Sequence, residues 1–306
     1  MISRKEFLKQ AAYLSAGTML PFSFGRLSDP NIAAPDITIL YTNDTHARLD
    51  PFPSNAKEFA GLGGIARRAS LVKKVRATQK NVLLLDAGDV FQGTPWFDVY
   101  GGKVDLKLMT EMKYDAMAVG NHEFDRGTDG FAEAAQKAGF PILASNYSVR
   151  NTPMSSFVQR QLIKEFKGFR IGIFGLGIEL NGVVNRDLYG NVRYSDAERT
   201  ARRMVESLRG FHRCDYIICL SHLGYQYTDN RPNDVKLAGS VEGIDLIIGG
   251  HTHTFLDEPV IRENPEGKPT IITQMGHSGV RVGRLDLRFS EMNVDHQFRF
   301  YTIDGK

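Results

Sequence analysis

The chain has 306 residues, of which 42% are hydrophobic and 24% charged, and its formal net charge is +3. These values are ordinary for a globular protein and exclude an intrinsically disordered chain. Thirty-eight basic residues nearly balance 35 acidic ones, and no dense Lys/Arg run occurs, so no nucleic-acid-binding surface is indicated. The length allows one large α/β domain or two small ones.

The first 25 residues differ from the rest and are typical of an export signal. A charged start at residues 3–9 is followed by an apolar stretch at 11–24. This order predicts export to the periplasm or the cell surface, with an amphipathic helix of the domain as the alternative. The start is similar to a twin-arginine signal, except that Lys5 stands where the second arginine belongs. No apolar stretch is long enough to predict a membrane span.

Residues 26–35 are rich in turn formers and predict a linker, and 36–306 predict a single domain. Within that domain, apolar runs alternate with helix-like stretches. Short apolar runs predict strands at 37–41, 82–85, 116–119, 142–144, 170–174, 216–220 and 246–248. Helical spacing of apolar residues predicts helices at 64–79, 104–113, 130–138 and 196–209. Residues 269–300 predict further strands without a helix, and the alternation as a whole favours a layered α/β domain.

Five of the predicted strands end in side chains that bind metals. The segments that follow them are TNDTH (42–46), DAGD (86–89), GNHE (120–123), SH (221–222) and GGHTH (249–253). Because sites in α/β sheets form beyond the carboxyl ends of the strands, we expect these side chains to lie close together. Carboxylate, amide and imidazole groups suit Zn, Mn or Fe better than copper. Each motif alone is common, but five of the eight histidines fall in them, which favours one shared site.

Taken together, these motifs resemble the signature of calcineurin-like metallophosphoesterases. The longer segments TNDTH (42–46), GDVFQGT (88–94), GNHEFD (120–125) and ASN (144–146) resemble the 5′-nucleotidase branch of that family, as do Gln274 to Gly276, Gly279 and the segment 283–285. The resemblance extends over residues 36 to about 290. It implies a four-layer α/β/β/α sandwich, in which helices flank two facing mixed sheets.

The resemblance also implies a role for each motif residue. One divalent ion would be held by Asp44, His46 and His253, and the other by Asn121, His222 and His251. Asp89 would bridge the two ions, which would be Zn, Mn or Fe. His122 would stabilise or protonate the leaving group, and Asp125 would orient His122.

The activity that this resemblance implies is that of a two-metal phosphohydrolase of the 5′-nucleotidase type. Its substrate would be a small phosphorylated molecule, a nucleotide or a related phosphoester, as in nucleotide catabolism. Two ions about 3.5–4 Å apart can share a water and lower its pKa, and the resulting hydroxide attacks phosphorus. Three alternatives stay open: a phosphodiesterase or nucleotide-sugar hydrolase of the same fold, an enzyme that cleaves another bond such as a thiosulfonate, and a non-catalytic binding or regulatory subunit.

A second domain distinguishes the 5′-nucleotidase branch. There, as the resemblance implies, a C-terminal domain supplies aromatic residues that clasp the base and arginines that grip the phosphate. The sequence stops at Lys306, soon after the last predicted strands. We therefore expect either that a separate chain supplies this domain or that the substrate is recognised differently.

Three further residues are candidates for the mouth of the site. Trp96 and Phe97 follow the GDVFQGT segment, although aromatic residues in such places more often anchor a loop. His277 lies in a glycine-rich segment from which it could reach the site.

Two other groups of residues predict structure rather than function. The basic pairs at 67–68 and 73–74 predict a solvated helix face rather than a phosphate site. Cys214 and Cys219 predict buried core residues that face opposite sides of an extended segment, so no disulfide is expected between them.

Overall fold

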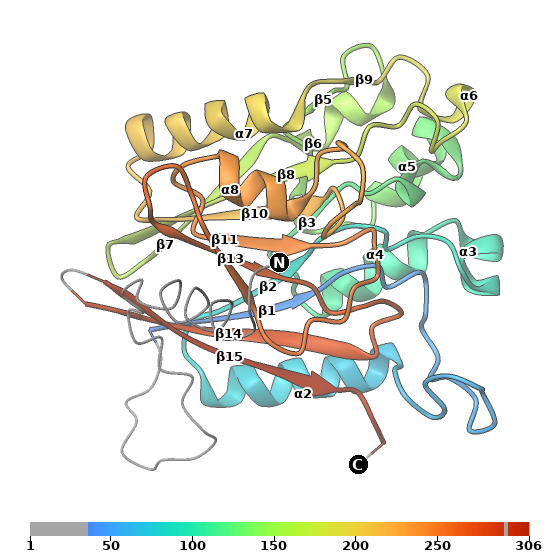
Figure 1. The fold of residues 1–306 in the computed structure, drawn as a ribbon. Helices are drawn as coiled ribbons and strands as arrows, with labels where there is room; N and C mark the ends of the chain where they lie inside the picture. The colour runs from blue at the N-terminus through green and yellow to red at the C-terminus, as the bar shows by residue number, and fades with distance from the viewer. Residues whose placement is uncertain (1–35, 291–292, 306) are drawn as a thin grey trace, which may run out of the picture.

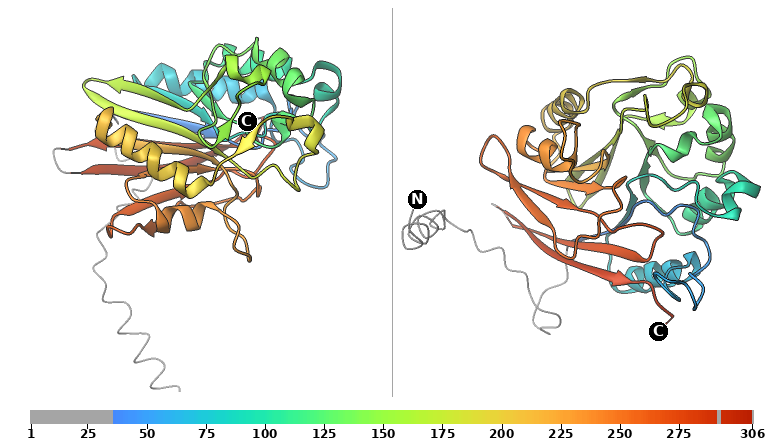
Figure 2. Two further views of the ribbon diagram at one scale, coloured as in Figure 1. Left: turned by 90° about the horizontal axis from the view of Figure 1, so that it is seen from above. Right: turned by 45° about the vertical axis from the view of Figure 1, so that its right-hand side comes forward.

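The computed structural model describes residues 36–290 and 293–305. The predicted export signal and linker at 1–35 lie outside these residues. Two facing sheets form the centre of the molecule, and helices cover the outer face of each, as the three views of Figures 1 and 2 show. The predicted four-layer α/β/β/α arrangement is therefore confirmed.

The first sheet contains seven strands in the order β15-β14-β1-β2-β3-β4-β6. Their bounds are β1 (Ile37–Thr42), β2 (Val82–Asp86), β3 (Ala116–Ala118), β4 (Ile142–Leu143), β6 (Val158–Gln159), β14 (Arg281–Phe289) and β15 (Val294–Thr302). The run from β1 to β6 is parallel, whereas β14 pairs antiparallel with β1 and β15 antiparallel with β14.

The second sheet contains six strands in the order β12-β13-β11-β10-β8-β7. Their bounds are β7 (Gln161–Phe166), β8 (Phe169–Gly177), β10 (Tyr216–His222), β11 (Leu246–Gly249), β12 (Val260–Glu263) and β13 (Pro269–Thr273). The four inner strands are parallel, and both edge strands are antiparallel to their neighbours. A small third sheet pairs β5 (Tyr147–Ser148) with β9 (Arg193–Tyr194).

Side-chain alternation along the strands builds the core in three parts. In β1, Ile37 and Ile39 face the opposite sheet, whereas Leu40 faces the helices. In β10, Ile218 faces the first sheet and Ile217 faces outward. Because successive residues of a strand point to opposite faces, a central strand that is apolar at every position is buried on both sides. This explains why the short, wholly apolar runs were sufficient to predict the central strands.

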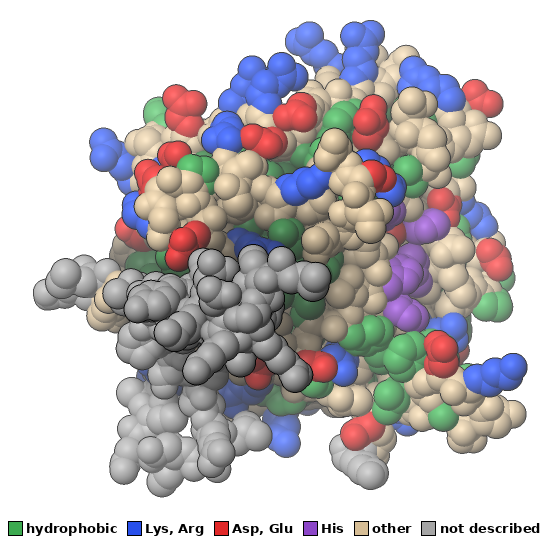
Figure 3. Space-filling view, viewed as in Figure 1, with side chains coloured by type: hydrophobic (Ala, Val, Ile, Leu, Met, Phe, Trp, Pro, Cys, Tyr) green, Lys and Arg blue, Asp and Glu red, His purple; other side chains and the backbone are tan. Residues whose placement is uncertain are grey.

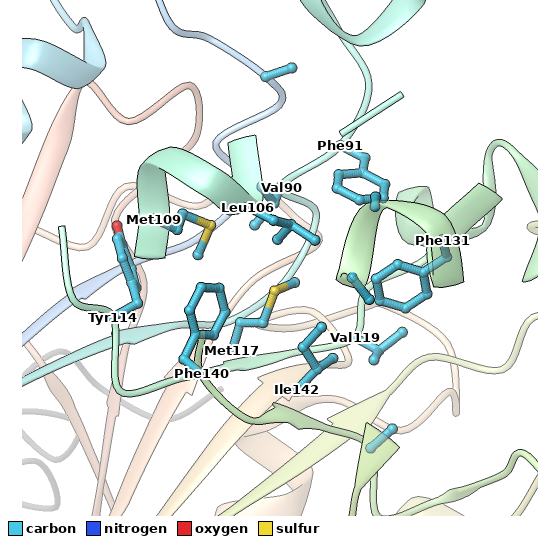
Figure 4. Packing of buried hydrophobic residues seen from close by; sticks show 14 of the residues in the cluster. Val90, Phe91, Leu106, Met109, Tyr114, Met117, Val119, Phe131, Phe140 and Ile142 are labelled. Atoms are coloured by element: carbon cyan, nitrogen blue, oxygen red, sulfur yellow. The ribbon is translucent and has the colours of Figure 1, made fainter. Parts of the chain in front are cut away.

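Helices complete the outer layers. Their bounds are α2 (Ile65–Thr78), α3 (Pro95–Tyr100), α4 (Lys103–Glu111), α5 (Gly127–Ala135), α6 (Arg186–Tyr189), α7 (Ala197–Val205) and α8 (Asp234–Ser240), with short turns η1 (His122–Phe124), η2 (Pro153–Ser156) and a π-helical η3 (Glu206–Phe211). Figure 4 shows Leu106 and Met109 of α4 and Phe131 of α5 packed over Met117 and Ile142 of the first sheet. None of the helices in residues 36–290 and 293–305 has the length and apolarity needed to span a lipid bilayer.

Two sequence predictions about buried residues were wrong. Arg68 of α2 is only 3% exposed and does not belong to a solvated face. Its guanidinium occupies space beside Gly279, where a Cβ atom would lie 1.5 Å from Nη1. Cys214 and Cys219 lie in the same apolar cluster rather than on opposite sides, because Cys214 precedes β10 and is not part of the strand. Both thiols are nevertheless free, as predicted.

Candidate metal centre

The ends of five strands from both sheets meet at one place. The segments after β1, β2 and β3 come from the first sheet, and the segments after β10 and β11 come from the second. A contact between the sheets demonstrates the convergence: Nε2 of His222, at the end of β10, lies 2.9 Å from Oδ2 of Asp89, which follows β2. The side chains that the sequence places after these strands are therefore assembled as predicted.

The first cluster contains Asp44, His46 and His253, whose candidate ligand atoms all lie within 4.8 Å of one another. Nε2 of His253 lies 3.5 Å from Oδ1 of Asp44, and Nε2 of His46 lies 4.0 Å from the same oxygen. The two imidazole Nε2 atoms are 2.9 Å apart. One carboxylate oxygen and two ring nitrogens thus converge on one point, which is a donor set for a divalent cation.

The second cluster contains Asp89, His222 and His251, again within 4.8 Å. Asn121 joins it, because its Oδ1 lies 2.8 Å from Nδ1 of His251. Nε2 of His222 is 4.0 Å from Oδ1 of Asp44, so the two clusters adjoin. All seven residues that the resemblance implies as ligands therefore lie in one region, with Asp89 grouped with the second cluster.

The hydrogen bonds of His222 fit a metal ligand. Its side chain is fully buried, and its Nδ1 donates to the carbonyl oxygen of Ala87 at 2.8 Å. Its Nε2 faces the Asp89 carboxylate, with Oδ2 at 2.9 Å. A ligating histidine commonly donates its other N–H to a carbonyl in this way, which fixes the tautomer. His46 follows the same pattern, because its Nδ1 donates to the carbonyl oxygen of Phe91 at 3.2 Å.

The electrostatics of the second cluster also favour a cation. Burial alone would lower the pKa of His222, but the adjacent Asp89 carboxylate raises it to about 10. The Asp89 carboxylate is itself 2% exposed and needs a positive charge beside it. A divalent cation between these donors satisfies that requirement. The mixture of oxygen and nitrogen donors suits Zn, Mn or Fe.

The backbone at the ligands adopts an unusual conformation. Five of the seven have a positive φ, which non-glycine residues rarely adopt: Asp44 (49°), His46 (49°), Asp89 (54°), His251 (70°) and His253 (54°). Such strain persists only where the surrounding structure enforces it, and it is concentrated at functional sites. Here the turns direct several side chains toward the same small volume. Nothing in the residue types themselves predicts this feature.

Glu123 supports the centre without being a predicted ligand. Its side chain is 0% exposed and accepts backbone N–H groups from Gly120 at 2.6 Å, Asp89 at 3.0 Å and Val90 at 2.9 Å. One carboxylate therefore ties the segment after β2 to the segment after β3. Its place in the GNHE motif (120–123) is the only sequence signal for this role.

Two buried amides support the segments after β1 and β11. Asn43 donates to Oδ2 of Asp44 at 2.6 Å and accepts the backbone N–H of Met275 at 2.8 Å. Gln274 donates to the carbonyl oxygen of Gly250 at 2.9 Å and accepts the backbone N–H of Thr254. The segment around residues 274–276 therefore positions both ends of the first cluster.

His122 and Asp125 form the predicted pair beside the clusters. Nδ1 of His122 lies 2.8 Å from Oδ2 of Asp125, and the two side chains are 32% and 28% exposed. The backbone N–H of His122 donates to Oδ1 of Asp89, and its ring lies 5.3 Å from that of His46. Burial opposes protonation of His122, but the hydrogen bond to Asp125 and the charge of Asp89 raise its pKa above the ordinary value. The pair is therefore adjacent to the centre and accessible to solvent.

The rim of the centre includes one of the three mouth candidates. His277 stacks on His253 with ring centroids 4.8 Å apart, so it does reach the site. Phe97 is buried in the core, as expected of a loop anchor. Trp96 donates its indole N–H to Asp50 and lines a surface cavity of about 410 Å³. Figure 3 shows the histidine side chains as one exposed group on this face of the molecule.

Comparison with known proteins agrees with this geometry. Among curated proteins, the chain is 35% identical over 291 residues to the trifunctional nucleotide phosphoesterase YfkN of Bacillus subtilis, covering 85% of this chain and 18% of that protein. It is 35% identical over 272 residues to human 5′-nucleotidase, covering 84% of this chain and 46% of that protein. The chain thus spans about half the length, or less, of these relatives.

A solved structure shows the same relationship. The crystal structure of a 5′-nucleotidase precursor from Thermus thermophilus superimposes with a TM-score of 0.79 at 33% identity, over 87% of this chain and 54% of that one. The family description that matches the sequence is calcineurin-like phosphoesterase, over residues 37–255. This matched range contains both clusters and the His122–Asp125 pair. The chain therefore belongs to the calcineurin-like phosphoesterase family.

Proposed function

We propose that this chain is a metal-dependent phosphohydrolase of the 5′-nucleotidase type, acting on nucleotides or related phosphoesters. The observation that carries the proposal is the convergence of two adjoining ligand clusters with the His122–Asp125 pair beside them. The names of the relatives support the choice of substrate, since they include nucleotide phosphoesterases and 5′-nucleotidases.

Two cations would lie in the two clusters. Asp44, His46 and His253 would hold one, and Asn121, His222 and His251 the other, with Asp89 between them. Divalent ions bound in this way polarise phosphoryl oxygens and lower the pKa of water. Asp89 contacts His222 of the second cluster, and its charge also acts on His46 of the first, which supports a bridging role.

His122 would act on the leaving group. Asp125 accepts a hydrogen bond from the Nδ1–H of His122 and thereby fixes the ring orientation. This leaves Nε2 to carry the proton that a departing oxygen needs. A histidine next to a carboxylate is the usual arrangement for such a transfer. A non-catalytic subunit of the same fold has no use for this pair, which favours an enzyme over a binding subunit.

The test is a substrate panel with and without a chelator. The panel contains a nucleoside 5′-monophosphate, a 2′,3′-cyclic nucleotide, a nucleotide sugar and a bis-aryl phosphate. We expect chelator-sensitive phosphate release, fastest from the monophosphate. Faster cleavage of the cyclic nucleotide, the nucleotide sugar or the bis-aryl phosphate would instead identify the phosphodiesterase or nucleotide-sugar alternative. Failure to hydrolyse even a simple aryl phosphate after loading with Zn, Mn or Fe would identify a binding subunit.

We also propose that the protein is exported, on the strength of the charged and then apolar order of its first 25 residues. Fractionation of cells that produce the native chain tests this directly. Recovery of the full-length chain in the cytoplasm would contradict export. A separate chain that supplies a C-terminal substrate domain stays a prediction, and light scattering of the natively expressed protein checks it.

A further inference from the structure

We propose that Phe59 and Phe255 form a pocket that binds the flat ring of the substrate's leaving group, such as a nucleobase. The substrate class assumed here rests on the proposed function. The pocket has a volume of about 610 Å³, and its lining includes Leu62, Val280 and Arg281. Pockets for small molecules have this size and consist of apolar walls with a few polar groups.

His277 connects this pocket to the first ligand cluster. One side of the His277 ring stacks on the predicted ligand His253, with centroids 4.8 Å apart and planes at 28°. The ring also contacts Phe59 at 5.3 Å and Phe255 at 5.8 Å. A ring held by these phenylalanines would therefore lie one side chain away from the metal centre. Figure 3 shows hydrophobic side chains gathered directly beside the exposed histidines.

The two phenylalanine rings are held in place by their backbone surroundings. Their centroids are 5.6 Å apart with planes at 35°. Phe59 has a φ of 55°, which a bulky residue adopts only where its contacts enforce it. Phe255 packs where Gly276 has no side chain, since a Cβ there would lie 2.1 Å from its ring. Rings that are already ordered lose little entropy when a ligand binds.

Charges at the edge of the pocket orient the substrate. Glu58 lines the pocket and is exposed, so it repels a phosphate but can accept hydrogen bonds from amino or hydroxyl groups. The guanidinium of Arg281 lies over the Phe255 ring at 4.9 Å and pairs with Asp257 at 2.7 Å, so its charge is already partnered. The phosphate is therefore directed to the metal centre, and the ring with its uncharged donors is directed to the pocket.

The competing interpretation is that the two rings only pack neighbouring loops together. A packing role predicts that their loss affects every substrate equally. The test compares kcat/KM for adenosine 5′-monophosphate and for ribose 5-phosphate, which lacks the ring. Phe59→Leu, Phe255→Leu and the double variant keep an apolar side chain but remove the flat surface. Phe211→Leu is the matched control, because Phe211 is 82% exposed and lies outside the pocket.

We expect kcat/KM for adenosine 5′-monophosphate, divided by kcat/KM for ribose 5-phosphate, to fall roughly tenfold in the double variant. Stacking on one aromatic side chain stabilises a bound base by about 1–3 kcal/mol. The double variant should hydrolyse ribose 5-phosphate with the wild-type kcat/KM. The control variant should keep the wild-type kcat/KM for both substrates. An unchanged ratio, or equal losses for both substrates, would overturn the pocket.

Binding of adenosine to the full chain, measured by saturation-transfer NMR, separates this inference from the proposed function. Adenosine has no phosphate, so its binding needs no hydrolysis. If neither phosphoester is hydrolysed but adenosine binds to the wild type and not to the double variant, the proposed function fails and the pocket stands. Adenosine that does not bind to the wild type, or that binds equally to both proteins, overturns the pocket.

Discussion

Glu123 accepts the backbone N–H of Asp89 at 3.0 Å, and through this bond a residue of η1 fixes the loop that carries a predicted metal ligand. Glu123→Gln replaces one acceptor oxygen by an amide donor, which faces backbone N–H groups that it cannot satisfy. We expect a loss of about 2–4 kcal/mol in unfolding free energy and weaker metal binding. Thermal unfolding and elemental analysis measure the two effects. Glu133→Gln is the control, because that side chain is 62% exposed and its pairing with Lys103 contributes little.

Gly120 is predicted to tolerate no side chain. A Cβ at this position would lie 2.2 Å from Oδ1 of Asp89 and 2.6 Å from its backbone nitrogen. Gly120→Ala should therefore displace Asp89 and abolish metal binding at the second cluster, while the rest of the fold persists. Gly239→Ala provides the control, since nothing lies within 4 Å of that position in α8 and alanine favours a helix. Equal metal contents in the two variants would show that the Asp89 position is not constrained as described.

His122 is predicted to act on turnover and not on metal binding. His122→Ala should keep its metal content and lose roughly 10²–10⁴-fold in kcat, because general acid catalysis contributes about that much. Asp125→Asn should give a smaller loss, since it disturbs only the orientation of the ring. Steady-state kinetics alongside elemental analysis check both variants. Normal turnover in His122→Ala would remove the role assigned to it.

The buried His296 should lower the unfolding free energy in mild acid. Burial lowers its pKa from 6.5 to about 4, against the opposing effect of Asp295, and Tyr216 Oη lies 2.9 Å from its Nε2. Between these two pKa values the unfolded chain binds more protons than the folded chain, so the unfolding free energy falls as the pH is lowered from about 6.5 to 4. His296→Gln should reduce this fall by on the order of 1–3 kcal/mol. Denaturant unfolding of the wild type and His296→Gln at pH 7 and pH 4.5 provides the measurement. An equal fall in unfolding free energy in both proteins would contradict the prediction.

The central strands and the ligands could be predicted from the sequence because both are local signals. Ile37, Leu84 and Ile218 belong to apolar runs that are buried on both faces, and the motif residues follow those runs directly. The edge strands β7 and β12 were missed, since they are only partly buried and show no continuous apolar run. The short helices α3, α6 and α8 were missed because four to seven residues are too few to show a period.

Other features depend on contacts between distant segments. Arg68 reads as one of a pair of basic surface residues, and only the absence of a side chain at Gly279 makes room for it in the interior. The pocket beside His277 combines Phe59 from the loop before α2 with Phe255 from the segment after β11. No spacing within either segment signals their meeting. The positive φ angles at the ligands are likewise a consequence of the assembled site.

One centre, built from residues between Asp44 and His253, is predicted to bind divalent ions. The most direct test is elemental analysis after loading with Zn, Mn or Fe. It compares the metal content of the purified wild-type chain with that of His222→Ala and Asp44→Asn. We expect about two ions per wild-type chain and a clear loss in each variant, while circular dichroism shows that the secondary structure is retained. A folded wild-type chain that retains no divalent ion, or variants that bind as much metal as the wild type, would contradict it.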